Sequence, residues 1–546
     1  MNKKSAQKQK RLHTIDKRPQ GRLSFLLILL IGCNLFHTDN MLGKTQATTP
    51  QGLNGLTVTI ECDSSKGLPG IIIVGLGSKS VDESKERIRS AFRNTKLELP
   101  PRKFTINLAP ANIPKDGTRF DLAMCVAMLI STKQIAPSKL EKSYFIGEIG
   151  LSGKLRPVQG LLASLMHLRS SGDDISFYVP AANAAEATLI KGAVVYPISS
   201  LRELYDHLTG SVPITPYKGK HIQNTDEYPI NFDDVAAQDT AKRALTIAAA
   251  GNHNILLSGP PGTGKTTLAN ALRSVLPRLS EAELLDVIAL HSLVSVLNID
   301  SHSVMRPFRK PHHSSSLVSL VGGGATPKPG EVSLAHNGVL FLDELPEYAR
   351  SALEALRQPL EDNFVTVSRA SATVSFPAKF ILVATRNPCP CGYYGDKKRE
   401  CICTAHQINQ YNKKLSGPLL DRIDMHIPVN RLESAALHRT AESTNVQTIR
   451  AREQIHQARE VQALRFNAYD KCNAEMTNRE LTRNCQLEKK TQDFLDNAVD
   501  KLQLSPRVYM KTLKVSRTIA DLAGRQDIAL EDVAEALSFR EQSSII

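Results

Sequence analysis

The chain has 546 residues, too many for a single hydrophobic core, so the sequence predicts about three or four domains. Its 41% hydrophobic and 22% charged residues exclude a disordered or fibrous protein, and nothing beyond the first forty residues is apolar over a length that could cross a membrane. The net charge of +14 is compatible with a polyanionic partner, but eight basic and two acidic residues within positions 1–40 account for +6 of it.

Residues 1–40 form a basic and apolar leader that is not expected to belong to the fold. A basic stretch from Lys3 to Arg22 runs into the apolar segment Leu23–Phe36, and Leu30-Ile31-Gly32-Cys33 resembles the cleavage box of an exported lipoprotein. The alternative is that Met41 is the true first residue. The nine cysteines of the chain predict no secreted disulfide framework.

Residues 41–210 are predicted to form an α/β domain, and the polar, Pro-containing stretch 211–230 to be a linker. Ser80 and Glu83 have the spacing of a capping box, which is expected to begin a charged helix that runs to Phe92. The other expected elements are strands over Ile71–Val74, Phe104–Leu108 and Tyr144–Ile149 and a buried helix over Leu122–Ile130.

Residues 231–430 predict a second α/β domain with a phosphate-binding loop of the form G-x-x-x-x-G-K-[ST]. Glycines allow consecutive backbone N–H groups to turn towards phosphates, and the N-terminus of the following helix adds a favourable dipole. Lys265 is expected to reach the β- and γ-phosphates of ATP, and Thr266 to bind Mg²⁺. Ile255–Leu257 predicts the strand before the loop, and Thr267–Ser274 the helix after it. The loop comprises Gly259, Pro260, Pro261, Gly262, Thr263, Gly264, Lys265 and Thr266.

Two further predicted strands end in polar residues that suit the same site. Val339–Leu342 is uniformly apolar, as in a strand buried on both faces of a parallel sheet. Asp343 and Glu344 follow it, at the end where α/β proteins bind ligands. Asp343 is expected to hold Mg²⁺ through water, and Glu344 to polarise the attacking water. A strand over Phe380–Ala384 leads to Asn387, which looks like a first sensor between the phosphate and the attacking water.

Two arginines are candidates to complete the site. Arg422, within Leu419–Asp424, is expected at a subunit boundary as an arginine finger on the neighbour's γ-phosphate. The alternative is a surface salt bridge between Arg422 and Asp424. Arg507, at the start of a C-terminal helix, is the expected second sensor. Basic residues on nearby turns that compete for this role are Lys511, Lys514 and Arg517.

Residues 431–546 are predicted to form a C-terminal helical domain. Glu433–Leu464 has the charge of a solvent-facing helical segment, and Thr477–Phe539 is expected to be helical. Asp527 is the expected N-cap of an amphipathic helix that ends near Leu537.

Four cysteines lie close together in the sequence after the third predicted strand of the second domain. Cys389-Pro390-Cys391 and Cys401-Ile402-Cys403 are separated by a polar, charged stretch of nine residues. Four thiolates at this density can form a tetrahedral zinc site with Zn–S distances of about 2.3 Å. Free thiols and a redox pair are the alternatives.

With these motifs in place, the chain resembles the magnesium-chelatase-like AAA+ ATPase family from about Leu42 to Phe539. The resemblance implies an AAA+ parallel-sheet domain with a C-terminal helical lid. It also implies a homo-hexameric ring that acts on DNA as a branch-migration helicase. The stretches that carry the resemblance are Gly70–Gly77, Asn107–Leu122, Arg306–Glu344, Asn387–Tyr394, Leu415–Asp424 and Arg507–Leu522.

Residues 41–210 resemble the α/β proteolytic domain of Lon protease without its catalytic dyad. Pro114-Lys115-Asp116-Gly117 looks like the segment before the catalytic serine, but Arg119 stands in place of that serine. Leu162 occupies the place of the catalytic lysine. A Ser–Lys dyad needs both a nucleophile and its base, so we expect no peptidase activity.

Two segments covered by the resemblance suggest where the ring holds DNA. A basic stretch before Asp343 looks like the insert that related DNA motors push into the ring pore; a solvated loop or a subunit contact is the alternative. Phe364–Ser368 and Ala372–Phe376 predict a hairpin of the kind that related rings use in the pore, with Arg369 as a candidate DNA contact in its turn. The candidate contacts in the basic stretch are Arg306, Arg309, Lys310, His312 and His313.

We therefore expect a cytoplasmic ring ATPase that uses ATP and magnesium, with zinc as a candidate structural metal. Its expected partners are further copies of itself and single-stranded or branched DNA, with neither a membrane nor a porphyrin. Because a motor that consumes ATP would have no fuel outside the cell, Met41 is the expected start. A protein-remodelling ATPase is the alternative. A magnesium-chelatase motor subunit is less favoured, because the chain lacks the integrin-like metal-binding domain of that machine's partner subunits.

Overall fold

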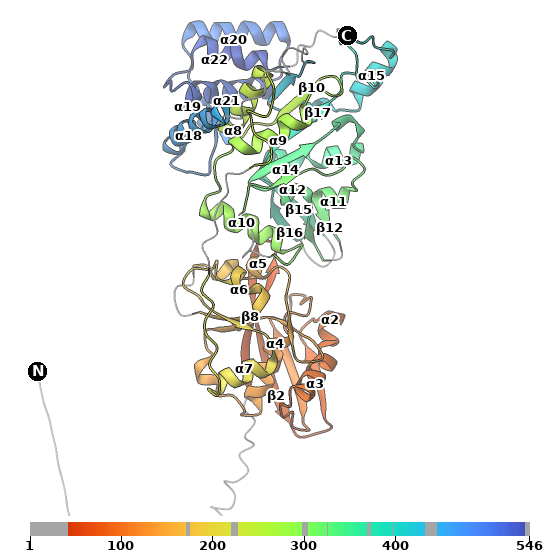
Figure 1. The fold of residues 1–546 in the computed structure, drawn as a ribbon, viewed down its shortest axis with the longest axis vertical. Helices are drawn as coiled ribbons and strands as arrows, with labels where there is room; N and C mark the ends of the chain where they lie inside the picture. Colours follow the sequence, from red (N-terminus) through yellow and green to blue (C-terminus); the bar gives the residue numbers. More distant parts are fainter. Residues whose placement is uncertain are drawn as a thin grey trace, which may run out of the picture.

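The computed structural model describes residues 42–170, 175–219, 228–297, 304–324, 326–368, 373–396, 398–431 and 445–540 (Figure 1). Two bodies are stacked along its long axis, an N-terminal one drawn in red to yellow and a larger one drawn in green to blue. The leader expected over 1–40 and the candidate start Met41 lie outside the described residues. Within the described ranges, no helix combines the length and the apolarity needed to cross a membrane.

The N-terminal body is built on a seven-stranded mixed sheet with the order β3-β4-β2-β1-β5-β8-β9. β1, β2 and β4 pair antiparallel, whereas β3, β5, β8 and β9 join through parallel pairs. Every residue of helix α4 is buried, so this helix lies in the core of the body. The strands are β1 (Gly43–Gln51), β2 (Asn54–Ser65), β3 (Gly70–Val74), β4 (Lys103–Ala109), β5 (Ser143–Phe145), β8 (Ser176–Pro180) and β9 (Val194–Ile198). The α-helices are α2 (Lys79–Asp82), α3 (Ser84–Asn94), α4 (Asp121–Ser131), α5 (Leu161–Leu165), α6 (Ala184–Ala187) and α7 (Leu201–Leu208).

The capping box expected at Ser80 is wrong. Ser80 lies inside α2, where its hydroxyl is 2.7 Å from Ser78 Oγ and accepts the Gly117 N–H at 3.2 Å. The charged helix is therefore broken into α2 and α3, and Glu83 precedes α3 without a side-chain cap. Three other expected elements are confirmed, namely β3 over Ile71–Val74, β4 over Phe104–Leu108 and α4 over Leu122–Ile130.

The strand expected over Tyr144–Ile149 is wrong as a single element. β5 ends at Phe145, the Ile146 N–H still donates to the Tyr178 carbonyl of β8 at 3.0 Å, and the Gly147 N–H then donates to the Arg119 carbonyl at 2.9 Å instead of to a neighbouring strand. The remainder forms the short strand β6 (Glu148–Ile149), which pairs antiparallel with β7 (Leu155–Arg156) in a separate two-stranded sheet.

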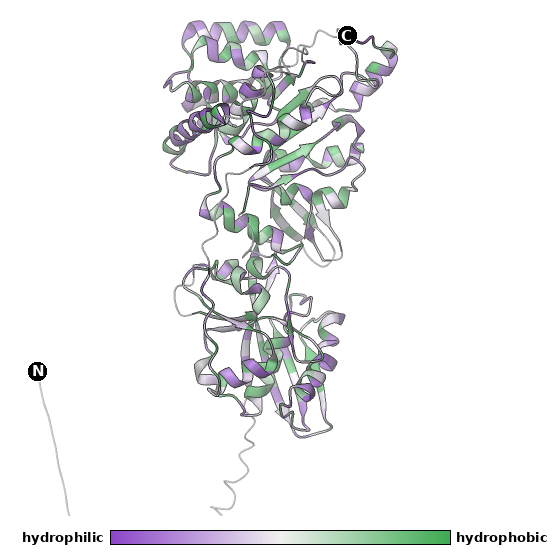
Figure 2. Ribbon diagram, in the orientation of Figure 1, coloured by the Kyte–Doolittle hydropathy of each residue, from purple (hydrophilic) through white to green (hydrophobic). Residues whose placement is uncertain are grey.

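The larger body contains a five-stranded parallel sheet with the order β11-β14-β17-β10-β18. Because all neighbours are parallel, the carboxyl ends of its strands meet at one edge, where α/β proteins bind ligands. β14 is buried throughout and β17 nearly so, and Figure 2 shows hydrophobic residues along the strands of this sheet. Three expected strands are thus confirmed: one precedes the phosphate-binding loop, one precedes Asp343 and one precedes Asn387. The strands are β10 (Ile255–Ser258), β11 (Phe308–Arg309), β14 (Gly338–Leu342), β17 (Phe380–Arg386) and β18 (Met425–Pro428).

Helices surround this sheet, and short elements extend from it (Figure 1). The helices are α8 (Asp239–Gly251), α9 (Lys265–Val275), α10 (Glu281–Ser292), α11 (Leu317–Val321), α12 (Glu331–Leu334), α13 (Arg350–Ala355), α14 (Arg357–Asp362), α15 (Ala405–Lys413) and α16 (Gly417–Leu420). Two small two-stranded sheets complete the body, β12 (Gly322–Gly323) with β13 (Lys328–Pro329) and β15 (Phe364–Ser368) with β16 (Thr373–Pro377).

β15 and β16 form the expected hairpin, in antiparallel register from Phe364 opposite Pro377 to Ser368 opposite Thr373. Alternate residues of both strands are buried, so one face of the hairpin packs against the body. Arg369, the candidate DNA contact in its turn, lies outside the described residues.

The last part of the chain is helical, as expected, and its longest helices pack on α8. The expected N-cap Asp527 is wrong: α22 begins at Leu530, and Asp532 in its first turn accepts the Ala529 N–H at 2.8 Å. Residues 433–444 of the first expected helical segment lie outside the described residues, and the helix is described from Val446. The helices are α18 (Val446–Phe466), α19 (Asn478–Asn484), α20 (Lys489–Leu502), α21 (Pro506–Leu522) and α22 (Leu530–Ser538).

The two bodies meet through α5 of the N-terminal body and α10 of the larger one. The Gly160 N–H, at the start of α5, donates to the Ser292 carbonyl at the end of α10 at 2.7 Å. Ile288 and Ala289 of α10 share one buried apolar cluster with α5. The turn between β1 and β2 also approaches the β15–β16 hairpin, since a Cβ added to Gly52 would lie 2.9 Å from the Ser375 carbonyl oxygen. The N-terminal body therefore contacts the helix after α9 and the hairpin.

Candidate nucleotide-binding site

The phosphate-binding loop joins the end of β10 to the first turn of α9. Gly262 and Gly264 have φ values of 75° and 86°, a left-handed conformation that glycine adopts without steric cost. Gly264 is also the N-cap of α9, so the free N–H groups of the first helical turn border the loop. The predicted order of strand, loop and helix is confirmed.

Lys265 lies over this loop and reaches the end of a second strand. Its ammonium group donates to the carbonyls of Gly259 at 2.6 Å and Pro260 at 2.8 Å, and to Asn387 Oδ1 at 3.3 Å. Burial lowers the pKa of Lys265, and the carboxylates of Asp343 and Glu344 partly offset this effect. The candidate first sensor and the loop lysine are therefore brought together.

Asp343, at the end of β14, has three donors around its carboxylate. Thr266 Oγ1 lies at 3.3 Å, Thr385 Oγ1 at 2.7 Å and Lys310 Nζ at 3.1 Å. Burial raises the pKa of Asp343, but the hydrogen bonds from Thr385 and Lys310 outweigh burial and hold that pKa below its ordinary value. An ionised Asp343 beside the Thr266 hydroxyl supplies oxygen ligands of the kind that Mg²⁺ prefers.

Glu344 follows in a strained backbone conformation. Its φ of 52° and ψ of 54° are left-handed, which is uncommon for a residue with a side chain and recurs at functional sites. The Glu344 N–H donates to Thr385 Oγ1 at 2.9 Å, and its side chain is exposed at the strand edge. This turn directs Glu344 away from the sheet core and towards the strand edge. The predicted role of Glu344, as the base for an attacking water, requires that position.

Thr385 and Lys310 belong to this site, although the sequence does not assign them to it. Thr385 is fully buried on β17, and its hydroxyl joins Asp343 to the backbone of Glu344. The sequence signal that could have identified Thr385 is its position as a polar residue at the end of an otherwise apolar strand. Lys310, which the sequence places among the candidate DNA contacts, lies instead beside Asp343 and over the Phe341 ring at 5.1 Å. The parallel pairing of β11 with β14 brings it there.

Arg306 and Arg309 of the basic stretch are engaged within the body. Arg306 pairs with Glu283 at 3.2 Å and donates to three backbone carbonyls, with 12% of its side chain exposed. Arg306 therefore stabilises the fold from inside. The prediction that it contacts DNA is not supported by this position. Arg309 forms two parallel hydrogen bonds to Glu331, at 2.6 and 2.7 Å, which neutralise its charge.

His312 and His313 lie on the surface after β11. Their rings are 4.0 Å apart, and the His312 ring nitrogen Nδ1 lies 2.7 Å from Ser314 Oγ. His312 is exposed and His313 half-buried against Tyr348. Of the candidate contacts in the basic stretch, Lys310 is also exposed but pairs with Asp343, whereas these two histidines form no ion pair among the described residues.

Arg422 and Arg507 are brought together by a residue that the sequence does not single out. Arg422 Nη2 lies 2.8 Å from Glu361 Oε1, and Arg507 Nη2 lies 2.5 Å from the same oxygen. Arg422 does not form the alternative salt bridge to Asp424, because Asp424 pairs with Lys511 at 2.6 Å. The two candidate arginines therefore meet at one carboxylate oxygen, with Arg422 largely enclosed and Arg507 exposed.

The residues that compete with Arg507 are engaged elsewhere. Lys511 is held by Asp424, Lys514 donates to the Ala474 carbonyl at 2.8 Å, and Arg517 pairs with Asp521 at 3.0 Å. Arg507 has 48% of its side chain exposed, whereas Arg517 has 3%. Among these residues, Arg507 is therefore the one with the most exposed guanidinium group, which is compatible with the predicted role of second sensor.

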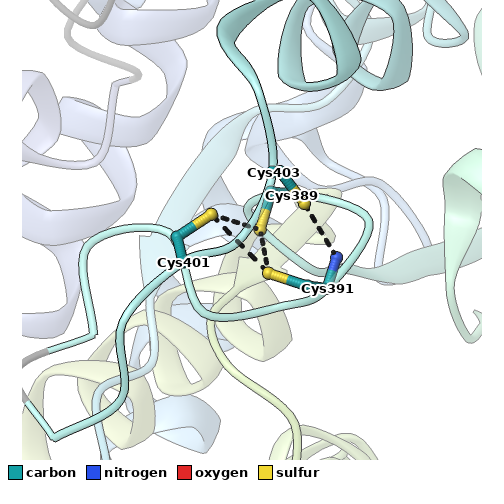
Figure 3. Close-up of side chains that lie close together, drawn as sticks. All are labelled: Cys389, Cys391, Cys401 and Cys403. Atoms are coloured by element: carbon teal, nitrogen blue, oxygen red, sulfur yellow. Dashed lines mark hydrogen bonds between the residues drawn. The ribbon is translucent and has the colours of Figure 1, made fainter.

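The four clustered cysteines converge after β17 (Figure 3). All four Sγ atoms lie within 4.8 Å of one another, and Cys389 Sγ is 3.3 Å from that of Cys391 and 3.6 Å from that of Cys401. The Tyr394 N–H donates to Cys389 Sγ at 3.3 Å, and the Cys391 N–H to Cys403 Sγ at 3.4 Å. Backbone donors around clustered sulfurs suit thiolate ligands.

This cysteine cluster is in contact with the phosphate-binding loop. Gly392 has φ of 84°, and a Cβ added to it would lie 2.6 Å from Pro261 Cδ and 3.9 Å from Asn387 Cγ. A side chain at position 392 would therefore push Pro261 out of place. The segment that carries the cysteines therefore packs directly against the loop.

The positions that resemble the Lon dyad lie at the contact between the bodies. Arg119 donates to the Gln159 carbonyl at 2.7 Å, and burial lowers its pKa to about 10. Leu162 is fully buried in the apolar cluster that includes α10. Leu162 therefore serves packing between the bodies, whereas the hydrogen bond of Arg119 stays within the N-terminal body.

Family models match three parts of the chain. The model described as magnesium chelatase, subunit ChlI, matches residues 231–437, which include the nucleotide site. The model described as subunit ChlI of Mg-chelatase matches residues 60–183, and that of the subunit ChlI C-terminal part matches residues 444–540.

Curated relatives extend the likeness to almost the whole chain. Competence protein ComM of Haemophilus influenzae is 42% identical over 495 residues, which cover 90% of this chain and 95% of the relative. YifB of Escherichia coli K12 is 40% identical over 491 residues, with the same coverage. The magnesium-chelatase 67 kDa subunit of Chlorobaculum parvum is 27% identical over 162 residues, or 29% of this chain and 23% of that protein. The chain therefore belongs to the magnesium-chelatase-like AAA+ ATPase family and is of the ComM/YifB type.

Proposed function

We propose that this protein is a ring-forming ATPase that acts on DNA, as a branch-migrating or helicase-type motor. Family membership implies an ATPase. The observation that carries the proposal is the convergence of Lys265, Thr266, Asp343 and Asn387 at one edge of the parallel sheet. The DNA substrate is supported by the β15–β16 hairpin, the accessible His312 and His313, and likeness to a competence protein over 90% of the chain.

In the proposed reaction, the triphosphate lies against the N-terminus of α9, where free backbone N–H groups bind its oxygens. Lys265 exchanges its loop carbonyl partners for the β- and γ-phosphates. Thr266 and Asp343 would hold Mg²⁺, which neutralises phosphate charge when bound. Glu344 then polarises the attacking water, and Asn387 orients it.

The proposed ring is a homo-hexamer in which each nucleotide lies between two subunits. Arg422 and Arg507 share Glu361, so one surface presents both guanidinium groups. In the ring this surface faces the nucleotide of the neighbouring protomer, with Arg422 on its γ-phosphate. An arginine finger supplied in this way raises hydrolysis by about 10³–10⁵.

The proposal also assigns a structural zinc ion to Cys389, Cys391, Cys401 and Cys403. Tetrahedral coordination with Zn–S of about 2.3 Å separates the sulfurs by about 3.8 Å. The closest sulfur pairs are 3.3 to 3.6 Å apart, so the site needs only a small expansion. Metal analysis of the purified protein should find about one zinc per chain, lost in Cys389→Ser. A metal-free protein would support free thiols if all four react, or a redox pair if two are oxidised.

The experiment that tests the motor function compares activators of ATP hydrolysis. Forked DNA, single-stranded DNA and an unfolded protein are each added to the purified chain, and phosphate release is measured. Branch migration on a defined four-way junction is followed with ATP and with a non-hydrolysable analogue. Stimulation by DNA and migration with ATP alone support the proposal. Stimulation by unfolded protein alone would support the alternative, a protein-remodelling ATPase.

A magnesium-chelatase motor subunit is the weaker alternative. The likeness to the 67 kDa chelatase subunit covers 29% of this chain, whereas the likeness to ComM covers 90%. The proposal retains the division into residues 41–210, 211–230, 231–430 and 431–546, with a Lon-like first domain and a helical lid. It places the protein in the cytoplasm, where ATP is available.

A further inference from the structure

Glu361 contacts both the candidate arginine finger, Arg422, and the candidate second sensor, Arg507. Arg422 follows α16, Arg507 lies in the first turn of α21, and both guanidinium groups contact the same Glu361 oxygen. One carboxylate cannot neutralise two guanidinium groups, so this cluster keeps one positive charge in excess. Such a cluster favours an anion with more charge and more oxygens than a carboxylate.

The γ-phosphate of ATP has that chemistry. It carries three acceptor oxygens and can bind two arginines at once, whereas Glu361 offers both of them a single oxygen. Glu361 itself is 39% exposed, so a ligand can replace it at the arginines without opening the core. Arg422 is more enclosed, at 11% exposed, and also donates to the Pro418 carbonyl at 2.5 Å, which limits where it can move.

Glu361 is also close in sequence to the hairpin proposed to contact DNA. It lies in the last turn of α14, and Asn363 ends that helix with φ of 59°. β15 begins at the next residue, and the Ala378 N–H donates to the Asn363 carbonyl at 2.8 Å, which closes the base of the hairpin. A movement of Glu361 would therefore be transmitted to both strands of the hairpin, because no flexible linker separates α14 from β15.

We propose that Glu361 is a positioning residue that couples the nucleotide of the neighbouring subunit to the β15–β16 hairpin. The inference rests on the roles proposed above for Arg422 and Arg507. While the neighbour holds no γ-phosphate, Glu361 binds both guanidinium groups and fixes the end of α14. A bound γ-phosphate takes the arginines from Glu361, and α14 and the hairpin are released to a second position. Hydrolysis and loss of phosphate return the arginines to Glu361.

Hydrogen–deuterium exchange of peptides that span residues 364–377 tests this coupling in the full-length ring. Wild type, Glu361→Gln, Glu361→Asp and Asp362→Asn are each measured with and without saturating non-hydrolysable ATP analogue. Asp362 is the matched control, because it is the exposed acidic neighbour of Glu361 and forms no ion pair among the described residues. Wild type and Asp362→Asn should show a nucleotide-dependent change in exchange. Glu361→Gln should lose that change, and Glu361→Asp, which keeps the charge, should restore part of it.

A Glu361→Gln protein that keeps the wild-type change would overturn the inference, as would a wild type whose hairpin does not respond to nucleotide. Nucleotide binding and ring size are also measured on each variant. If misfolding causes the loss of the exchange response, nucleotide binding and ring assembly are lost with it, and Glu361→Asp does not restore the response. The exchange experiment contains no DNA. Failure of DNA to stimulate hydrolysis would therefore refute the proposed substrate while leaving the coupling through Glu361 to be judged on its own result.

Discussion

Replacing Asp424 with Asn is expected to weaken the attachment of α21 to the parallel sheet. Asp424 precedes β18 and is buried, with Oδ1 at 2.6 Å from Lys511 Nζ and Oδ2 accepting the Asn254 N–H at 2.8 Å. Asn keeps the size and can still accept from Asn254, but it leaves the buried ammonium group without a charge partner. Loss of one partner from a buried ion pair costs about 3–5 kcal/mol. The lower end, about 3 kcal/mol, is expected because Lys511 also donates to the Arg422 carbonyl at 2.6 Å.

The destabilisation should depend on pH. Burial opposes ionisation of Asp424, but Lys511 and His253 outweigh burial and hold the pKa of Asp424 well below its ordinary value of 3.8. A carboxyl group with a depressed pKa in the folded state contributes its full stability above the unfolded pKa and loses it as the pH falls further. The difference between wild type and Asp424→Asn should therefore be constant near neutral pH and narrow below about pH 3.8.

Thermal unfolding followed by circular dichroism measures the effect, with exposed Asp493→Asn on α20 as the control. At about 2–4 °C per kcal/mol, the transition that includes α21 should fall by about 6–12 °C in Asp424→Asn. The double variant Asp424→Asn/Lys511→Met removes both partners and should recover most of that loss. A single-variant cost under about 1 kcal/mol, typical of an exposed pair, would refute the assignment of a buried ion pair. So would a double variant that is no more stable than the single one.

Three further predictions concern the nucleotide site. Glu344→Gln should bind ATP in a filter assay with wild-type affinity while phosphate release falls by at least about 10²-fold, and surviving turnover would show that Glu344 is not the base. When Arg422→Ala subunits are mixed with wild type, hydrolysis should fall more than in proportion to the variant fraction, whereas a linear response would contradict action on the neighbour. Lys310→Ala should reach half-maximal hydrolysis at lower Mg²⁺, because the Lys310 ammonium group competes with the metal for Asp343. If Lys310→Ala leaves the Mg²⁺ dependence unchanged but weakens DNA binding, Lys310 contacts DNA and does not compete with the metal.

The chemistry of the nucleotide site is largely readable from the sequence, because its main elements are local. The phosphate-binding loop is one contiguous run from Gly259 to Thr266, and the glycine positions, the strand before it and the helix after it are determined by neighbouring residues. Asp343 and Glu344 follow an apolar strand directly, so their place at the sheet edge follows from parallel pairing. Asn387 follows the next strand in the sheet in the same way.

Element boundaries are less well determined by the sequence. Ser80 has the spacing of a capping box, but its hydroxyl is taken by Ser78 and by the Gly117 N–H, which comes from a loop distant in the sequence. Asp527 has the right side chain for an N-cap, yet the helix begins three residues later, where Asp532 accepts the Ala529 N–H. In both places a hydrogen-bonding partner decides the boundary, and local spacing does not name that partner.

The partners of the charged residues were decided by the tertiary structure alone. Basic residues in one segment look equivalent in the sequence, yet Arg306 is bound inside the body, whereas Lys310 lies at Asp343 because β11 pairs with β14. Likewise, Arg422 meets Glu361 and not the nearby Asp424, because Lys511 on α21 reaches Asp424 from 87 positions away in the chain. Hydrophobic spacing specifies which face of an element is buried, but a charge pairs with whatever the fold brings within a few ångströms. The sequence by itself therefore determined which chemical groups this protein has, and the packing of its strands and helices determined which of them act together.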